Sequence, residues 1–249
     1  MLSIHIIFYL NQNMSNPLQN KLLAALPDPV LNRMLPHLDR VDLALGQMLY
    51  ESGSIMDFVY FPITAIVSLL HVLENGASAE IALVGNNGIV GIAVFMGGES
   101  TTHEAIVQRA GLAFRMPVSV FKKLFSDQLQ LQQLLLRYTQ ALFTQTAQTA
   151  ACNRHHSIDQ QFCRWLLSSE DLMSNATLVM TQELISNMLG VRRQGVTAAA
   201  KKLQSDGLIK YNRGHIKVLD RARLEERVCE CYLAVKNEYK RLMSQPLST

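Results

Sequence analysis

Cationic and amide side chains recur at helical spacing between residues 192 and 201 of this 249-residue chain. A guanidinium can bind the edge of guanine through two hydrogen bonds, and a carboxamide can do the same for adenine. A lysine ammonium binds phosphate oxygens. Together these are the chemistries of a helix laid in the major groove of DNA. The side chains concerned are Arg192, Arg193, Gln194, Thr197 and Lys201.

Apolar periodicity on both sides of these residues predicts two helices joined by a tight turn at Gly190. The first helix carries Leu184, Ile185, Met188 and Leu189, and the second carries Val191, Val196, Ala199, Ala200 and Leu203. A hairpin signal follows at Asn212-Arg213-Gly214. The predicted unit is therefore a winged helix-turn-helix. Its further candidate DNA contacts are Thr181, Lys210, Arg213 and Lys217.

The charge of the chain is concentrated in this same segment. Residues 1–150 hold eight Lys/Arg against ten Asp/Glu, whereas residues 178–221 hold eight against three. A phosphate-binding surface needs such a local field rather than a high overall charge. A solvated basic face on a small helical subdomain would also carry these charges. The turn glycine, the periodicity on both sides, the cationic tips and the hairpin occur together, and this coincidence favours DNA binding.

The cysteines Cys152, Cys163, Cys229 and Cys231 form no C-x-x-C pair and no recognisable zinc spacing. We expect free thiols in a reducing cytoplasm and no metal site. If Cys229 and Cys231 lie on one helix, their sulfurs point to different sides, which argues against shared ligation of one metal ion.

The first residues contain an apolar run from Ile4 to Leu10. It is too short to span a bilayer, which takes about 20 residues. It also lacks the basic leading region and cleavage site of a signal peptide. We expect residues 1–19 to form a disordered extension, with Met14 as an alternative start to Met1. The expected location is the cytoplasm, with no membrane partner.

The remaining chain divides by pattern into an α+β fold. Short β-rich runs separated by glycines predict a jelly-roll, or double-stranded β-helix, domain over residues 20–125. An uninterrupted helix is expected from about residue 118 to 152, and residues 126–153 are assigned to a dimerisation helix. The winged helix-turn-helix spans 154–222, where Ser157 and Gln160 predict a capping box. Residues 223–249 form a tail in which residues 224–243 read as one helix.

The long helix carries a stripe whose steps alternate between four and three residues, which is typical of a coiled-coil seam. We favour a homodimer through this stripe, because the roll and the terminal module leave it without an evident partner in the chain. The alternative is a helix packed only on its own domain. The stripe consists of Leu131, Leu135, Tyr138, Leu142, Gln145 and Thr149.

The order of roll, long helix, hinge and winged helix-turn-helix resembles the Crp/Fnr family of bacterial transcription regulators over about residues 20–222. The resemblance implies a homodimer that reads a roughly palindromic operator in double-stranded DNA, and it implies RNA polymerase as a partner. The motifs in the C-terminal third are Thr181-Gln182-Glu183-Leu184-Ile185, Leu189-Gly190-Val191, Arg193, Val196, Lys202-Leu203 and Gly207-Leu208-Ile209. Those in the roll are Leu45-Gly46, Leu49-Tyr50, Gly53, Val59-Tyr60-Phe61 and Gly91.

Carried over by position, Arg193 stands where the family commonly places an arginine that reads guanine. Gln194 replaces a glutamate that often reads cytosine, so a preference for adenine is expected there. Ala198 stands where another basic reader can lie. Arg192 occupies the usual serine N-cap, and because a guanidinium cannot accept amide protons, we expect it to bind phosphate.

The sensory half departs from the family pattern. In family members that bind a cyclic nucleotide, a carboxylate holds the ribose and an arginine holds the cyclic phosphate. In this sequence these two positions fall at Ile92 and at Thr102 or His103, with Gly91 beside them. An aliphatic side chain cannot bind a hydroxyl, and a buried phosphate needs a guanidinium. We therefore expect no cyclic nucleotide in the usual mode. No iron-sulfur cluster is expected either, because no cysteine precedes Cys152, and the effector stays unknown.

Two other classes of function are alternatives to a transcription regulator. A ligand-binding regulatory subunit that acts on another protein would use the roll, but it leaves Arg193 and the basic wing unexplained. An enzyme is not expected, because the sequence has no nucleophile elbow, phosphate-binding glycine loop, H-E-x-x-H motif or paired catalytic carboxylates.

Overall fold

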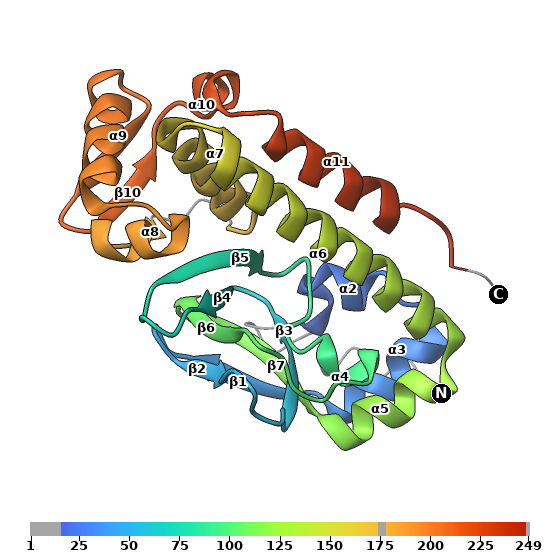
Figure 1. The fold of residues 1–249 in the computed structure, drawn as a ribbon. Helices are drawn as coiled ribbons and strands as arrows, with labels where there is room; N and C mark the ends of the chain where they lie inside the picture. The colour runs from blue at the N-terminus through green and yellow to red at the C-terminus, as the bar shows by residue number, and fades with distance from the viewer. Residues whose placement is uncertain (1–15, 174–177, 248–249) are drawn as a thin grey trace.

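The structure, a computed structural model, describes residues 16–173 and 178–247. A β-roll forms the N-terminal half, a long helix crosses it, and a second α/β unit lies at one end of that helix (Figure 1). The final helix then returns along the long helix. This arrangement confirms the expected α+β fold with a jelly-roll, a long helix and a winged helix-turn-helix.

The chain enters the roll through short helices that are pinned to it. The expected disordered extension is wrong for its last residues, because Pro17–Gln19 form the 3-10 helix η1, and residues 1–15 lie outside the described part. The buried Asn20 side chain accepts from the amides of Leu22 and Leu23 and donates to the carbonyls of Pro62 and Gly88. The helices that follow are α2 (Lys21–Ala24), α3 (Asp28–Met34) and the 3-10 helix η2 (Leu35–His37).

Two antiparallel sheets form the roll, in the strand orders β1-β7-β3 and β2-β6-β4-β5. Buried apolar side chains such as Val59, Phe61 and Val67 form its core, which explains the β-rich runs of the sequence. The strands are β1 (Asp39–Leu43), β2 (Met48–Tyr50), β3 (Phe58–Pro62), β4 (Ile66–Val72), β5 (Ser78–Val84), β6 (Glu104–Arg109) and β7 (Gly111–Pro117), with the short helix α4 (Ala93–Met96) between β5 and β6.

The long helix is interrupted, which the sequence did not predict. Helix α5 (Val118–Asp127) ends at Gln128, whose extended backbone also begins α6 (Leu129–His155). The amide of Gln132 donates to the carbonyls of Phe125 and Ser126 at 2.7 and 3.2 Å. These bonds replace helical hydrogen bonds that the break removes. A side chain thus stabilises a break where neither proline nor glycine marks one.

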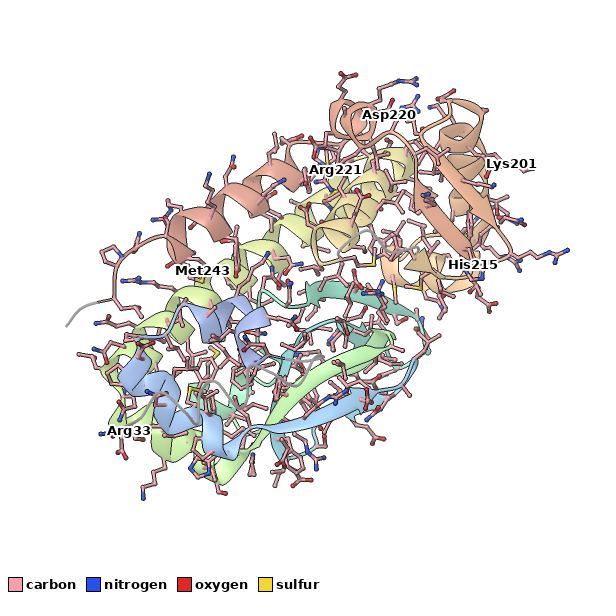
Figure 2. All side chains as sticks on the ribbon, turned by 180° about the vertical axis from the view of Figure 1, so that it is seen from behind. Arg33, Lys201, His215, Asp220, Arg221 and Met243 are labelled. Carbon is pink, nitrogen blue, oxygen red and sulfur yellow. The ribbon has the colours of Figure 1, made fainter. Side chains whose placement is uncertain are left out.

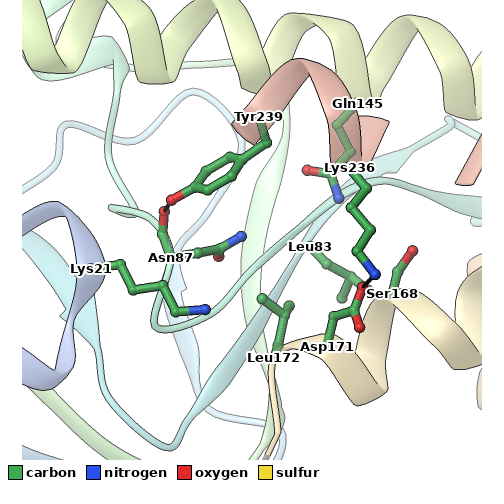
Figure 3. Close-up of a pocket in the computed structure, with 9 residues that line it drawn as sticks. All are labelled: Lys21, Leu83, Asn87, Gln145, Ser168, Asp171, Leu172, Lys236 and Tyr239. Carbon is green, nitrogen blue, oxygen red and sulfur yellow. Dashed lines mark hydrogen bonds and ion pairs between the residues drawn. The ribbon is translucent and has the colours of Figure 1, made fainter. Parts of the chain in front are cut away.

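The predicted dimer seam faces the inside of the chain. Leu131, Leu135, Tyr138, Leu142 and Thr149 are buried, and the first four belong to the core cluster of the roll. Gln145 lies at a crevice of about 290 Å³ where the roll meets α6 and the C-terminal helices (Figure 3). The expected seam is therefore wrong, because the roll itself is the partner that the sequence did not reveal.

The opposite face of α6 is exposed and carries apolar side chains at intervals of seven residues. Leu129, Leu136 and Phe143 are 56%, 58% and 73% exposed. Ala147 and Ala150 continue this face and are also exposed. We call these five residues the outer stripe of α6. It has the heptad spacing that was assigned to the buried face.

The C-terminal unit begins with α7 (Ile158–Asp171), where Ser157 and Gln160 form the predicted capping box. The expected single helix over residues 224–243 is wrong. It is divided into α10 (Arg221–Arg227) and α11 (Cys231–Met243), because Val228 has an extended backbone. Helix α11 then runs back beside α6 (Figure 1).

The C-terminal unit packs directly on the roll. Ile66 of β4 and Leu83 of β5 belong to the same buried apolar cluster as Phe162 and Leu166 of α7. The Gln108 amide of β6 also donates to the sulfur of Met188 at 3.4 Å. The two units therefore meet in one shared apolar core and are not held apart by a solvated linker.

At the crevice shown in Figure 3, polar contacts join the same parts of the chain. The Tyr239 hydroxyl of α11 donates to the carbonyl of Asn87 at 2.7 Å. The Lys236 ammonium lies 3.8 Å from the Asp171 carboxylate of α7. Helix α11 is thus tied to the roll and to α7.

Candidate nucleic-acid interface

The helix-turn-helix is formed by α8 (Gln182–Leu189) and α9 (Arg193–Ser205). Thr181 caps α8, since its hydroxyl oxygen accepts from the Leu184 amide at 3.2 Å. Gly190 ends α8 with a φ of 64°, a conformation that strains residues with a side chain. The amide of Val191 then donates to the Ser186 carbonyl at 3.0 Å. The predicted turn at Gly190 is confirmed.

Helix α9 buries its apolar stripe and presents its polar face to solvent. Val196, Ala199, Ala200 and Leu203 are buried. The exposed face consists of Arg193, Gln194, Ala198 and Lys201. Lys201 points away from the body of the protein (Figure 2). Arg192 is the N-cap and makes no side-chain capping bond, so its exposed guanidinium is available for a phosphate.

Thr197 has a structural partner inside the motif. Its hydroxyl lies 2.7 Å from the Gln182 carboxamide oxygen and 3.0 Å from the Arg193 carbonyl. Because Gln182 belongs to α8, the contact fixes the angle between the two helices. Thr197 therefore positions α9, whereas its predicted contact with DNA stays a prediction.

A two-stranded wing follows α9, with a third short strand completing the sheet in the order β8-β10-β9. Arg213 and Gly214 have φ angles of 47° and 82°, as a type I′ turn requires. Lys210 and Lys217 are paired across the strands and are exposed. Like charges that face each other are destabilising, so a bound phosphate would relieve their repulsion. The strands are β8 (Leu178–Val179), β9 (Ile209–Asn212) and β10 (His215–Val218).

The start of α9 and the turn of the wing enclose a hollow of about 300 Å³. Its predicted members are Thr181, Arg193 and Arg213, and sequence reasoning missed Gln182 and Tyr211. The Tyr211 hydroxyl donates to the Met180 carbonyl at 2.8 Å. Burial raises the pKa of this phenol, and the charge of Arg193 lowers it in part. The sequence carried one signal for Tyr211. Side chains alternate between the two faces of the wing strands, and Tyr211 pairs with the buried Ile216.

The candidate effector residues of the roll belong to two segments of the chain, one at the start of α4 and one just before β6. Gly91 has a φ of 106°, and a Cβ there would lie 3.2 Å from Val59. Ile92 stands at the N-terminus of α4 and packs on the core of the roll. Thr102 is exposed in the bend that precedes β6.

His103 cannot supply the cation that a cyclic phosphate needs. Its Nε2 lies 2.9 Å from the Tyr50 hydroxyl and its Nδ1 lies 2.6 Å from the Thr101 hydroxyl. Burial lowers the pKa of His103, and the nearby His71 lowers it further. Both effects disfavour the charged imidazolium, and both ring nitrogens already have partners.

A roll that shares a core with an exposed, cationic winged helix-turn-helix defines a DNA-binding protein with a sensory-type domain. Residues 160–227 match the family of Crp-like helix-turn-helix domains, and residues 40–128 match the cyclic nucleotide-binding domain family. The search of curated proteins found no match. This chain belongs to the Crp/Fnr family of DNA-binding transcription regulators.

Solved structures of regulators share the fold. FixK2 from Bradyrhizobium japonicum is 16% identical with a TM-score of 0.67, over 77% of this chain and 98% of that chain. The c-di-GMP-responsive global regulator CLP from Xanthomonas campestris is 15% identical with a TM-score of 0.61, over 78% and 100%. TTHB099 from Thermus thermophilus, a regulator of the CRP family, is 18% identical with a TM-score of 0.60, over 76% and 95%.

No helix within the described residues is long and apolar enough to cross a membrane.

Proposed function

We propose that this protein is a homodimeric regulator that reads a two-fold symmetric operator, with the α9 helices of both copies in successive major grooves. The hollow lined by Arg193 and Arg213 carries the proposal. It opens beside the exposed end of a helix whose other face is fully packed. A guanidinium at that end can reach a guanine edge while the wing binds the neighbouring phosphates.

The outer stripe of α6 supplies the surface for the second copy. Phe143 and Leu136 are 73% and 58% exposed on a helix that has no charged residue in this stripe. Heptad spacing lets two such helices pack side by side along a seam. Pairing through this face leaves the buried contacts with the roll intact, and it sets two α9 helices at a fixed separation.

The effector is a molecule other than a cyclic mononucleotide bound in the family's usual mode. The aliphatic Ile92 offers no acceptor for a ribose hydroxyl, and burial disfavours the charged form of His103 that a phosphate would need. Calorimetric titration with cyclic AMP and cyclic GMP tests this part. Binding at micromolar concentration would contradict it.

Selection from random duplexes, followed by gel-shift titration, tests the DNA-binding proposal. The full-length protein should enrich a two-fold symmetric motif. Replacing Arg193 with alanine should lower affinity for that motif by about 5- to 150-fold for each bidentate pair of hydrogen bonds removed, and leave binding to random DNA nearly unchanged. Arg33→Ala is the control, since this exposed arginine of α3 lies at the far end of the molecule (Figure 2). Selection of the same motif by the Arg193 variant would refute the assignment.

A further inference from the structure

Three cysteines and a histidine meet at the hinge between α6 and the C-terminal helices, although 77 residues separate Cys152 from Cys229. Their sulfur and ring-nitrogen atoms all lie within 4.8 Å of one another. We call this group the hinge cluster. It consists of Cys152 and His156 from the end of α6, of Cys229 from the α10–α11 connection, and of Cys231 from the start of α11.

The break between α10 and α11 creates the cluster. Cys229 precedes α11 and Cys231 is its first residue, so the two sulfurs need not diverge as they would on one helix. The premise that Cys229 and Cys231 lie on one helix is therefore wrong, and their sulfurs lie close together. The thiols are free, with no disulfide among them.

We propose that the hinge cluster binds one zinc ion through its three thiolates and its imidazole. In a tetrahedral site with Zn–S bonds of about 2.3 Å and a Zn–N bond of about 2.0 Å, two sulfurs lie about 3.8 Å apart and a sulfur and nitrogen about 3.5 Å apart. The observed separations are 3.5 Å between the sulfurs of Cys152 and Cys229, and 3.5 Å between Cys231 Sγ and His156 Nδ1. Soft sulfur ligands with one imidazole in this geometry favour zinc over harder cations.

The histidine is oriented as a metal ligand is. Its Nδ1 faces the sulfur of Cys231, and its Nε2 lies 3.3 Å from the Glu230 carboxylate. A ligating histidine commonly donates its other N–H to a carboxylate, which fixes the ring and raises the basicity of the ligand nitrogen. Glu230 is thus a positioning residue for His156.

A buried arginine supplies the charge that such a site requires. Zinc with three thiolates and a neutral imidazole carries a net charge of −1. Arg164 is only 7% exposed, and its Nε donates to Cys152 Sγ at 3.2 Å. Its Nη1 donates to the Thr149 hydroxyl at 3.2 Å, and its charge also acts on the buried carboxyl of Glu80. Because a buried cation is costly without compensation, thiolates beside Arg164 would help to balance its charge.

Buried thiols often serve only as small apolar side chains. Cys163 fits that description, since it is buried in the large C-terminal core. The other three cysteines instead form a separate small cluster of their own. Their contacts with an imidazole and a guanidinium distinguish them from apolar packing. Four protein ligands leave no open position, so the site is structural rather than catalytic.

Zinc at this place would join the end of the long helix to the connection that precedes α11. It would hold α11 against α6 and fix the exit of the chain into α7, which carries Arg164. Its expected role is to fix the orientation of the C-terminal unit. The proposal does not depend on DNA binding, so each can fail independently.

Metal analysis of the full-length protein, purified in reductant without chelator and desalted, tests the proposal. We expect one zinc ion per chain by inductively coupled plasma mass spectrometry. Cys229→Ala and His156→Ala should lose the metal. Cys163→Ala and His155→Ala are matched controls from the same region and should retain it. Equal loss in the controls, or no zinc in the unmodified protein after incubation with zinc, would overturn the site.

Cobalt substitution of the unmodified protein gives a second test that needs no variant to fold. Co(II) should show the intense visible bands of tetrahedral coordination and a thiolate charge-transfer band scaled to three sulfurs. A weak octahedral spectrum would overturn the proposal, as would a Cys152–Cys229 disulfide found in place of metal in protein kept under reductant. Glu230→Gln should weaken zinc affinity by about 10- to 100-fold in competition with a chromophoric chelator, and unchanged affinity would refute its positioning role.

Discussion

The phenol of Tyr138 in α6 lies over Gly88 in the roll, where its hydroxyl occupies the space that a Cβ on Gly88 would need. Tyr138 is 4% exposed, and burial raises the pKa of its hydroxyl well above the usual value. This contact explains why the stripe of α6 that contains Tyr138 cannot be a dimer seam. The roll already covers it.

Gly88→Ala should destabilise the protein by about 1–3 kcal/mol, because the added methyl group forces the buried ring to move. Denaturant unfolding measures this loss directly. Gly98→Ala is the comparison, since its backbone is not left-handed and a Cβ there would meet only the Ser100 carbonyl oxygen at 3.3 Å, so a smaller loss is expected. An unchanged midpoint for Gly88→Ala would mean that Tyr138 has room to shift.

Phe143→Glu should convert the protein from dimer to monomer. Burying this side chain in both copies contributes about 3–6 kcal/mol to association, and a carboxylate in the seam opposes it. Sedimentation velocity gives the oligomeric state. Leu233→Glu on α11 is a matched control, because Leu233 is also exposed, at 53%, but lies outside the outer stripe. A dimer that survives the Phe143 change but not the Leu233 change would place the interface on α11.

Lys217→Ala should weaken binding to all DNA sequences alike and lower the slope of log affinity against log salt by about 1. The reason is that Lys217 lies on the exposed wing beside Lys210, where it meets phosphate rather than base edges. Titrations at several salt concentrations measure the slope. Lys240→Ala, on α11, should leave the slope unchanged, and a loss of sequence preference in the Lys217 variant would contradict the assignment.

Stability should fall as pH rises from about 4.5 to about 7 because of Glu80. Burial raises the pKa of this carboxyl to about 7, although the Ser68 hydroxyl that donates to it at 2.6 Å and the charge of Arg164 lower it in part. The folded chain therefore keeps a proton that the unfolded chain releases near its ordinary pKa of 4.5. The loss amounts to roughly 3 kcal/mol and is complete above the folded pKa.

Glu80→Gln separates this effect from the titration of other groups. The neutral amide should remove the Glu80 contribution, so the free energy of unfolding of the variant relative to the original should rise between pH 5 and pH 8. Chemical denaturation at both pH values measures it. A difference that is the same at both would show that Glu80 is ionised in the folded protein at both values.

The local signals of the sequence predicted local structure well. Gly190, the Asn212-Arg213-Gly214 turn and the Ser157–Gln160 capping box each depend on residues a few positions apart. The exposed face of α9 followed from periodicity alone. These features could be read because their causes lie within one or two helical turns.

Long-range packing could not be read in the same way. Periodicity identified a stripe on α6 but not which partner would cover it, and the roll rather than a second copy buries Tyr138. The break at Gln128 depends on a side chain of the next helix. The hinge cluster depends on a break that no glycine or proline marks, so the ligands stay scattered along the sequence until the chain folds.

The shared core between the roll and the C-terminal unit limits how regulation can operate. Swinging the DNA-binding head away from β4 and β5 would expose Ile66 and Leu83 to water, at about 1.5–3 kcal/mol for each side chain. An effector must supply that free energy through its preference for one arrangement. Small displacements of the C-terminal unit that keep both side chains covered cost less free energy. Allosteric control therefore favours a shift of this unit along the sheet over a free rotation.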